Sequence, residues 1–135
     1  MKKKILFIST LFPYPLNNGG KIKTYNTLKM LSEKYEIDLI CYYEDDTELQ
    51  YKENLYNIVS SIELVKGKIT TKDNKLYMIC LGIKSIFSKL PLTVLKFLSK
   101  EFKCKVNKKL CDVKYEKIYI DHLQIAININ IKQNI

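Results

Sequence analysis

The chain has 135 residues, enough for one domain of ordinary size or for part of a larger one. An apolar share of 47% with 27% charged residues excludes an intrinsically disordered chain. The net charge of +9 comes from lysine alone, because the sequence contains no arginine, the residue that grips guanine and phosphate bidentately. This argues against a nucleic-acid reader and favours anionic partners such as diphosphates or acidic lipid. The general abundance of Lys, Ile and Asn is the alternative explanation of the charge.

The first half of the chain alternates between strand and helix patterns. Three apolar runs predict strands, and the nearly continuous first one is typical of a parallel strand covered on both faces. The apolar spacing that follows Gly20 predicts a helix, and Asp45 to Thr47 are candidate caps of a second helix that runs to about Val59. The order β-α-β-α-β implies a parallel sheet with right-handed crossovers. The predicted strands are Lys4–Ser9, Glu36–Tyr42 and Ile62–Gly67, and the apolar positions of the first helix are Ile22, Tyr25, Leu28, Leu31 and Tyr35.

The second half is mainly helical until a fourth strand, Glu116–Asp121. A helix is predicted from Lys75 to about Lys89, and Pro91 stands at the first turn of another that runs to Asp112. That helix carries lysines around one apolar stripe, formed by Leu95, Leu98, Phe102, Val106 and Leu110. We therefore expect an α/β fold, with a Rossmann-like parallel sheet and helices on both faces. Its domain spans 1–126, and 127–135 form an irregular tail.

No targeting or metal-binding signal is present. The apolar run after Lys2–Lys4 is too short for a signal peptide, and the longest apolar stretch, Leu76 to Ile83, is interrupted by Lys84. We expect a cytoplasmic protein, with peripheral association at the inner face of the membrane as an option. The cysteines show neither a CxxC pair nor zinc-ligand spacing, so free thiols and no metal are expected. They are Cys41, Cys80, Cys104 and Cys111.

The stretch "KKILFISTLFPYPLNNGGKIKTYN", Lys3 to Asn26, indicates where a ligand could bind. Its prolines end the strand, because they cannot donate to the sheet, and Asn17 or Asn18 can cap the next helix. Gly19 and Gly20 allow the backbone to come close to a ligand, and a loop that opens a helix after a strand suits an anion such as phosphate. Neither GxGxxG nor a P-loop is present. A tight turn that needs positive φ is the alternative role of the glycines.

Two segments resemble the N-terminal domain of GT-B glycosyltransferases of the family 4 type, which are retaining and use nucleotide sugars. The first consists of "ILFIS", "PYP" and "NNGGKIKTYNTLKMLSEKYEIDLIC", similar to the family's first strand, proline-rich loop, Gly-Gly pair, helix and second strand. The second, "YEKIYIDHLQIA" from Tyr115 to Ala126, is similar to a later strand that ends at the cleft between the two domains. The resemblance implies that the chain is the N-terminal, acceptor-side half of a GT-B fold, itself incomplete.

The resemblance also implies roles for individual residues. Gly19 and Gly20 would approach the diphosphate of the sugar donor, and Lys23 stands where relatives often have arginine. His122 would lie at the cleft near the acceptor or the transferring sugar, as the catalytic candidate, with a hydrogen-bonded and inert histidine as the alternative. Asp121 either orients the imidazole or ends the strand, and we favour the second. The nucleotide sugar is a substrate, and neither a cofactor nor a metal is expected.

The implied function is transfer of a sugar from a nucleotide-sugar donor to a polysaccharide or glycolipid acceptor. The family's second domain supplies most of the nucleotide contacts, and nothing after His122 can supply them. We therefore expect this chain alone to be catalytically inactive. A different hypothesis is a lysine-rich peripheral membrane or anion-binding module without catalysis. In that hypothesis the helix Pro91–Asp112 lies on an anionic membrane surface. A packed helix with a solvated basic face is the alternative for that segment.

Overall fold

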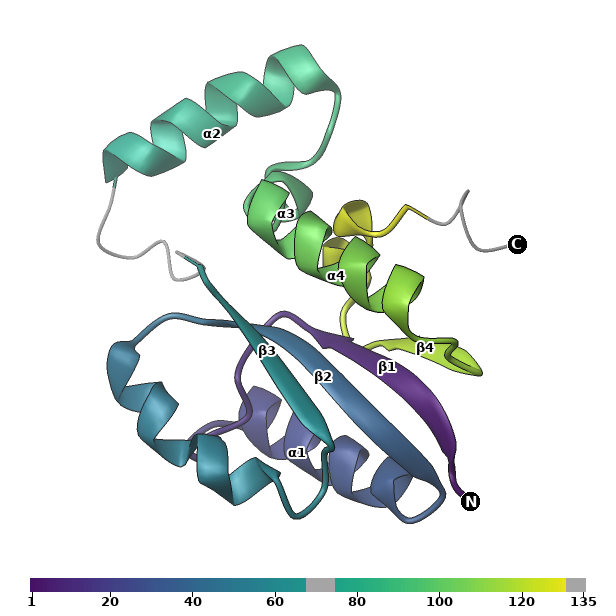
Figure 1. Ribbon diagram of the computed structural model, residues 1–135. Coiled ribbons are helices and arrows are strands. Elements are labelled where there is room, and N and C mark those ends of the chain that lie inside the picture. The colour runs from purple at the N-terminus through teal and green to yellow at the C-terminus, as the bar shows by residue number, and fades with distance from the viewer. Residues whose placement is uncertain (68–74, 131–135) are drawn as a thin grey trace.

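The computed structural model describes residues 1–67 and 75–130. In these residues the chain forms an α/β fold around a four-stranded sheet in the order β3-β2-β1-β4, and all three strand pairs are parallel (Figure 1). The predicted Rossmann-like sheet with helices on both faces is thus confirmed. Each strand lies within two residues of its predicted bounds. The strands are β1 Lys3–Ser9, β2 Tyr35–Tyr43, β3 Ser61–Lys66 and β4 Lys117–Ile120.

One face of the sheet is covered by the helix α1, Gly19–Ser32, and by the 3-10 helix η1, Asp46–Leu55. Successive strand residues point to opposite faces, so the odd-numbered Ile5 and Phe7 of β1 belong to this layer. Because β1 is buried on both sides, its apolar run is nearly continuous. The core of this face consists of Ile5, Phe7, Phe12, Leu28, Ile37, Leu39, Cys41, Leu55, Val59 and Ile62.

The other face is covered by α3, Leu92–Leu95, α4, Lys100–Asp112, and the 3-10 helix η2, Leu123–Asn128. The even-numbered Leu6 and Ile8 of β1 point to this side. The ring of Phe102 in α4 stacks on Tyr42 of β2 with ring centroids 4.5 Å apart. The core of this face consists of Leu6, Ile8, Ile40, Tyr42, Val65, Phe97, Phe102, Val106 and Ile125.

The prediction of one helix over Pro91–Asp112 is wrong. The chain breaks between α3 and α4, where the hydroxyl of Ser99 caps α4 by accepting from the Phe102 N–H at 3.2 Å. The Asn128 side chain, in turn, accepts from the Ser99 N–H at 3.0 Å. Phe102 and Val106 of the expected stripe are buried against the sheet, whereas Leu98 is exposed. The apolar side of α4 is therefore packed on the sheet.

Three smaller expectations also change. The helix expected through Val59 is a 3-10 helix that ends at Leu55. It begins with a capping box between Asp45 and Glu48. On α1, Thr24 is buried and Ile22 is exposed, the reverse of what the apolar spacing predicted. The tail expected from residue 127 begins later, because η2 runs to Asn128, whose side chain is buried and donates to the Phe97 carbonyl at 2.6 Å.

None of the helices in residues 1–67 and 75–130 is both long and apolar enough to cross a bilayer. β4 is an edge strand of the sheet, and its Ile118 and Tyr119 remain partly exposed.

Candidate functional site

The strand order creates a switch point between β1 and β4. From β1 the chain proceeds through β2 to β3 on one side, whereas β4 adds to the other side of β1. In parallel sheets the loops that follow the strands on either side of a switch point diverge, and ligands bind in the crevice at the carboxyl ends of these strands. Here β1 ends in Ser9 and continues to Thr10, and β4 is followed by Asp121 and His122.

A buried carboxylate, that of Asp121, organises this point. Its side chain is fully buried and accepts from the Thr24 hydroxyl at 2.6 Å and from the Lys23 ammonium at 2.8 Å. The Ser9 hydroxyl donates to it more weakly, at 3.4 Å. The hydrogen bond to Asp121 raises the pKa of Lys23 above its ordinary value. The carboxylate thus joins the end of β1, the helix α1 and the end of β4, so it does more than end a strand.

His122 lies beside this carboxylate and is half-buried. Its Nδ1 is 3.3 Å from Asp121 Oδ2 and 3.1 Å from the Thr10 hydroxyl. The tautomer that carries its proton on Nδ1 donates to the carboxylate and leaves Nε2 as a base or hydrogen-bond acceptor. A carboxylate behind an imidazole stabilises the charge that appears when Nε2 takes up a proton. The arrangement can therefore accept a proton from a hydroxyl group or hold that hydroxyl in place.

Two cavities meet at Thr10. The smaller, of about 140 Å³, has His122 in its wall and is otherwise lined by the end of β1, by the α3 region and by η2. Its lining residues are Thr10, Thr93, Lys96, Phe97, His122 and Gln124.

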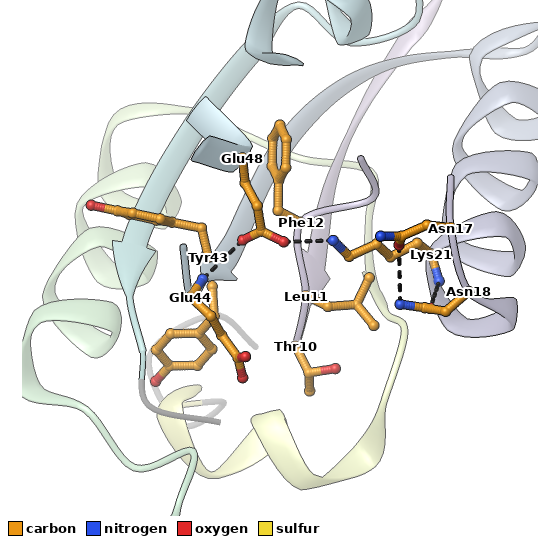
Figure 2. Close-up of a pocket in the computed structure, with 10 residues that line it drawn as sticks. Thr10, Leu11, Phe12, Asn17, Asn18, Lys21, Tyr43, Glu44 and Glu48 are labelled. Carbon is orange, nitrogen blue, oxygen red and sulfur yellow. Dashed lines mark hydrogen bonds and ion pairs between the residues drawn. The ribbon is translucent and has the colours of Figure 1, made fainter. Parts of the chain in front are cut away.

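The larger cavity, of about 320 Å³, lies between the loop after β1 and the end of β2 (Figure 2). Lys21 reaches into it from α1, donating to Glu48 at 2.6 Å and to the Tyr14 carbonyl at 3.1 Å. Figure 2 shows Asn17 and Asn18 on the α1 side and Glu44 on the opposite side. Amides, a carboxylate and an aromatic wall from Phe12 are groups that suit a polyhydroxylated ligand.

The predicted diphosphate-binding residues lie on α1, but they do not line the larger cavity, which α1 reaches only through Asn18 and Lys21. Gly19 and Gly20 form the first turn of α1, and Asn18 caps it by accepting from the Lys21 N–H at 3.0 Å. No glycine in the described residues has positive φ, so the tight-turn alternative does not apply. A Cβ at Gly19 would meet nothing within 4 Å, so this position is open to an approaching group. Lys23 is turned to Asp121, which partly neutralises its charge.

Replacing Gly19 by alanine is expected to keep the fold and to raise the free energy of unfolding by up to about 1 kcal/mol. The added methyl group meets no neighbour, and alanine loses less backbone entropy in a helix than glycine does. Urea unfolding followed by circular dichroism measures the change. A clear loss of stability would show that the fold itself requires glycine here. The glycine would then be no evidence that a ligand approaches this position.

The structure adds three residues that the sequence interpretation did not single out. Ser9 and Thr10 bring hydroxyls to the end of β1, and the buried Thr24 brings a third from α1. Thr24 precedes the buried Leu28 by one helical turn, and this spacing was the available signal. Their hydrogen-bond partners, Asp121 and His122, are about 100 residues away in the sequence, so no local pattern indicates the role of these hydroxyls.

No group of three or more His, Cys, Asp or Glu side chains in residues 1–67 and 75–130 is placed to hold a metal ion. All four cysteines are free, and only Cys41 is buried, which raises the pKa of its thiol. The candidate site therefore consists of hydroxyls, a carboxylate, an imidazole and lysines.

Comparison with curated proteins finds the "Uncharacterized 44.6 kDa protein in cps region" of Klebsiella pneumoniae, 31% identical to this chain over 117 residues. The match covers 83% of this chain but only 28% of that relative, so the chain spans less than a third of the relative's length. No family model matches the chain. No solved structure matches it either.

Proposed function

We propose that this chain is the acceptor-side, N-terminal part of a GT-B glycosyltransferase of the family 4 type. In this proposal a complete enzyme transfers a sugar from a nucleotide-sugar donor to a polysaccharide or glycolipid acceptor. The observation that carries it is the pairing of His122 with the buried Asp121 at the switch point of the sheet, beside two cavities. This is the edge at which parallel α/β sheets bind ligands.

Two further observations support the proposal. The two segments that carry the resemblance are far apart in sequence, yet Lys23 of the first contacts the carboxylate of Asp121 in the second, beside His122. The relative in Klebsiella pneumoniae belongs to a cps (capsule) region, where sugar transfer to a polysaccharide is a fitting activity.

The chemistry assigns each group a task. The first turn of α1, which is open at Gly19, admits the donor diphosphate, whose charge suits a helix N-terminus. The imidazole of His122 hydrogen-bonds a hydroxyl of the acceptor or of the transferring sugar through Nε2. Asp121 and Thr10 contact its Nδ1 and orient the ring. The larger cavity beside Lys21 and Glu48 takes a sugar ring.

The test is a titration of the isotopically labelled chain by nuclear magnetic resonance. A panel of uridine, guanosine and thymidine diphosphate sugars is added, followed by short oligosaccharides as acceptors. We expect amide shifts at Thr10, Gly19, Gly20 and His122, with weak affinity, since half of the cleft contributes few contacts. Shifts confined to other surfaces, or no shift with either ligand class, would contradict the proposal.

A pair of glycine variants separates ligand binding from stability. Gly19→Ala is expected to weaken binding of the nucleotide sugar at least about fivefold, because the new methyl group occupies the path of the diphosphate. Gly82→Ala is the matched control, since a Cβ at Gly82 in α2 (Lys75–Ser88) also meets nothing within 4 Å. Equal affinity of the two variants would exclude Gly19 from the donor site.

A further inference from the structure

The helix α2 stands apart from the sheet (Figure 1). Its principal neighbour in the described part of the chain is α3, and Leu81 is the single buried side chain within α2. The rest of the helix is nevertheless mostly apolar, and Leu76, Ile79, Ile86 and Phe87 are between 59% and 84% exposed. Packing within the described residues therefore accounts for only one side of this helix.

The exposed apolar side chains form a continuous stripe, which we call the α2 stripe. With 3.6 residues per turn, its members lie within an arc of about 120°, on the side of the helix opposite Leu81. A contiguous apolar surface of this kind marks a place where a protein meets another apolar phase. The α2 stripe consists of Leu76, Ile79, Ile83, Ile86 and Phe87.

The charges around the stripe indicate what that phase is. Between Lys75 and Lys100 the sequence has five lysines and neither aspartate nor glutamate. Lys84 lies beside the stripe, and Lys75 flanks it on the other side. A second copy of the chain would bring like charges together across the contact, which disfavours a dimer. An anionic lipid surface instead attracts the lysines and receives the apolar side chains.

We propose that α2 is a membrane-surface helix, which buries the α2 stripe among the headgroups of an anionic bilayer. The helix lies parallel to the surface, since it is too short to span it, and its lysines remain at the level of the lipid phosphates. This surface is distinct from α4, whose apolar side is buried against the sheet. The inference does not depend on the proposed glycosyltransferase activity.

The position of α2 also relates the membrane to the candidate site. α2 packs on α3, whose Thr93 lines the small cavity together with His122 and Lys96. An α2 helix on the bilayer therefore holds this cavity near the lipid. If the proposed function is correct, the arrangement suits an acceptor attached to a lipid.

Flotation of the full chain with lipid vesicles tests the inference. Vesicles of phosphatidylcholine with a minor share of phosphatidylglycerol are compared with vesicles of phosphatidylcholine alone. We expect binding to the first kind, weakened by added salt, and at least about tenfold weaker partitioning to the second. The double variant Ile86→Glu/Phe87→Glu is expected to lower partitioning at least about tenfold, because it removes two apolar groups and adds repulsion. Both side chains are exposed, so the fold does not depend on them.

Matched variants elsewhere keep the test specific. Met30→Glu replaces a 61% exposed apolar residue on α1 and should leave partitioning within about twofold of wild type. Lys75→Glu/Lys84→Glu should weaken binding to anionic vesicles more than Lys29→Glu/Lys34→Glu, although both pairs change the net charge equally.

Three results would overturn the inference. The first is that the wild-type chain fails to float with anionic vesicles. The second is that the Ile86→Glu/Phe87→Glu variant binds them as well as wild type does. The third is that sedimentation shows a dimer in wild type and a monomer in this variant, which would assign the α2 stripe to a second copy.

Discussion

Replacing Asp121 by alanine is expected to lower the free energy of unfolding by about 3 kcal/mol. The carboxylate is fully buried and accepts from the Thr24 hydroxyl, which is itself buried, so its removal leaves that donor without a partner. The same change withdraws the group that joins α1 to the ends of β1 and β4. Because the chain has no tryptophan, urea unfolding is best followed by far-ultraviolet circular dichroism.

An exposed ion pair of the same length provides the control for Asp121. Lys66 and Asp46 are also 2.8 Å apart, but their side chains are 57% and 68% exposed. Asp46→Ala should therefore change the unfolding midpoint very little, since water and salt screen this pair. Asp121→Asn, which keeps an oxygen for Thr24 and loses only the charge, should fall between the two alanine variants. Equal midpoints for Asp121→Ala and Asp46→Ala would show that the buried cluster does not hold the switch point together.

Replacing Asp38 by asparagine is expected to lower the free energy of unfolding by about 2 kcal/mol at neutral pH. Asp38 of β2 is buried and accepts from Ser61 at 2.6 Å and from Tyr115 at 2.5 Å. Lys109 of α4 lies 3.7 Å away and Lys4 of β1 lies 3.8 Å away. The carboxylate thus links its own strand β2 to β1, to β3, to the segment before β4 and to the helix α4.

The same carboxylate makes stability depend on pH. Burial alone would raise the pKa of Asp38, but the hydrogen bonds from Ser61 and Tyr115 and the charges of Lys109 and Lys4 outweigh it. The pKa in the folded state therefore lies below the ordinary value of 3.8. Since the folded pKa is the lower one, the stabilisation is fully present above pH 3.8 and is lost as the pH falls through the folded pKa.

Asp38→Asn removes the pH-dependent stabilisation by this carboxylate. The unfolding midpoint of the variant should therefore vary less with pH than that of wild type below about pH 4. The measurement is a series of urea unfolding curves from neutral to strongly acidic buffer. Asp46→Asn makes the same substitution at an exposed carboxylate and is the control for the change of residue type. Parallel curves for wild type and Asp38→Asn would contradict the role given to Asp38.

The succession of strands and helices could be predicted from the sequence, because it depends on local patterns. The apolar run of β1, the turn chemistry of Asn18 and Gly19, and the spacing around Leu28 each predicted an element close to where the structure has it. The break near Ser99 could not be predicted in this way. Its side chain caps α4, and its backbone N–H finds an acceptor only in Asn128, which folding brings beside it.

For the candidate site, too, local features could be predicted from the sequence and contacts between distant segments could not. The sequence by itself determined that Gly19, Gly20 and His122 follow strands of a parallel sheet, because strand ends and turn residues are local features. Only the tertiary structure decided that Lys23 and His122 share the buried carboxylate of Asp121, and that the apolar side of α4 is covered while that of α2 is exposed. These outcomes depend on which surfaces meet when distant segments pack. The sequence pattern of a helix with an apolar stripe is the same whether the stripe is covered or exposed.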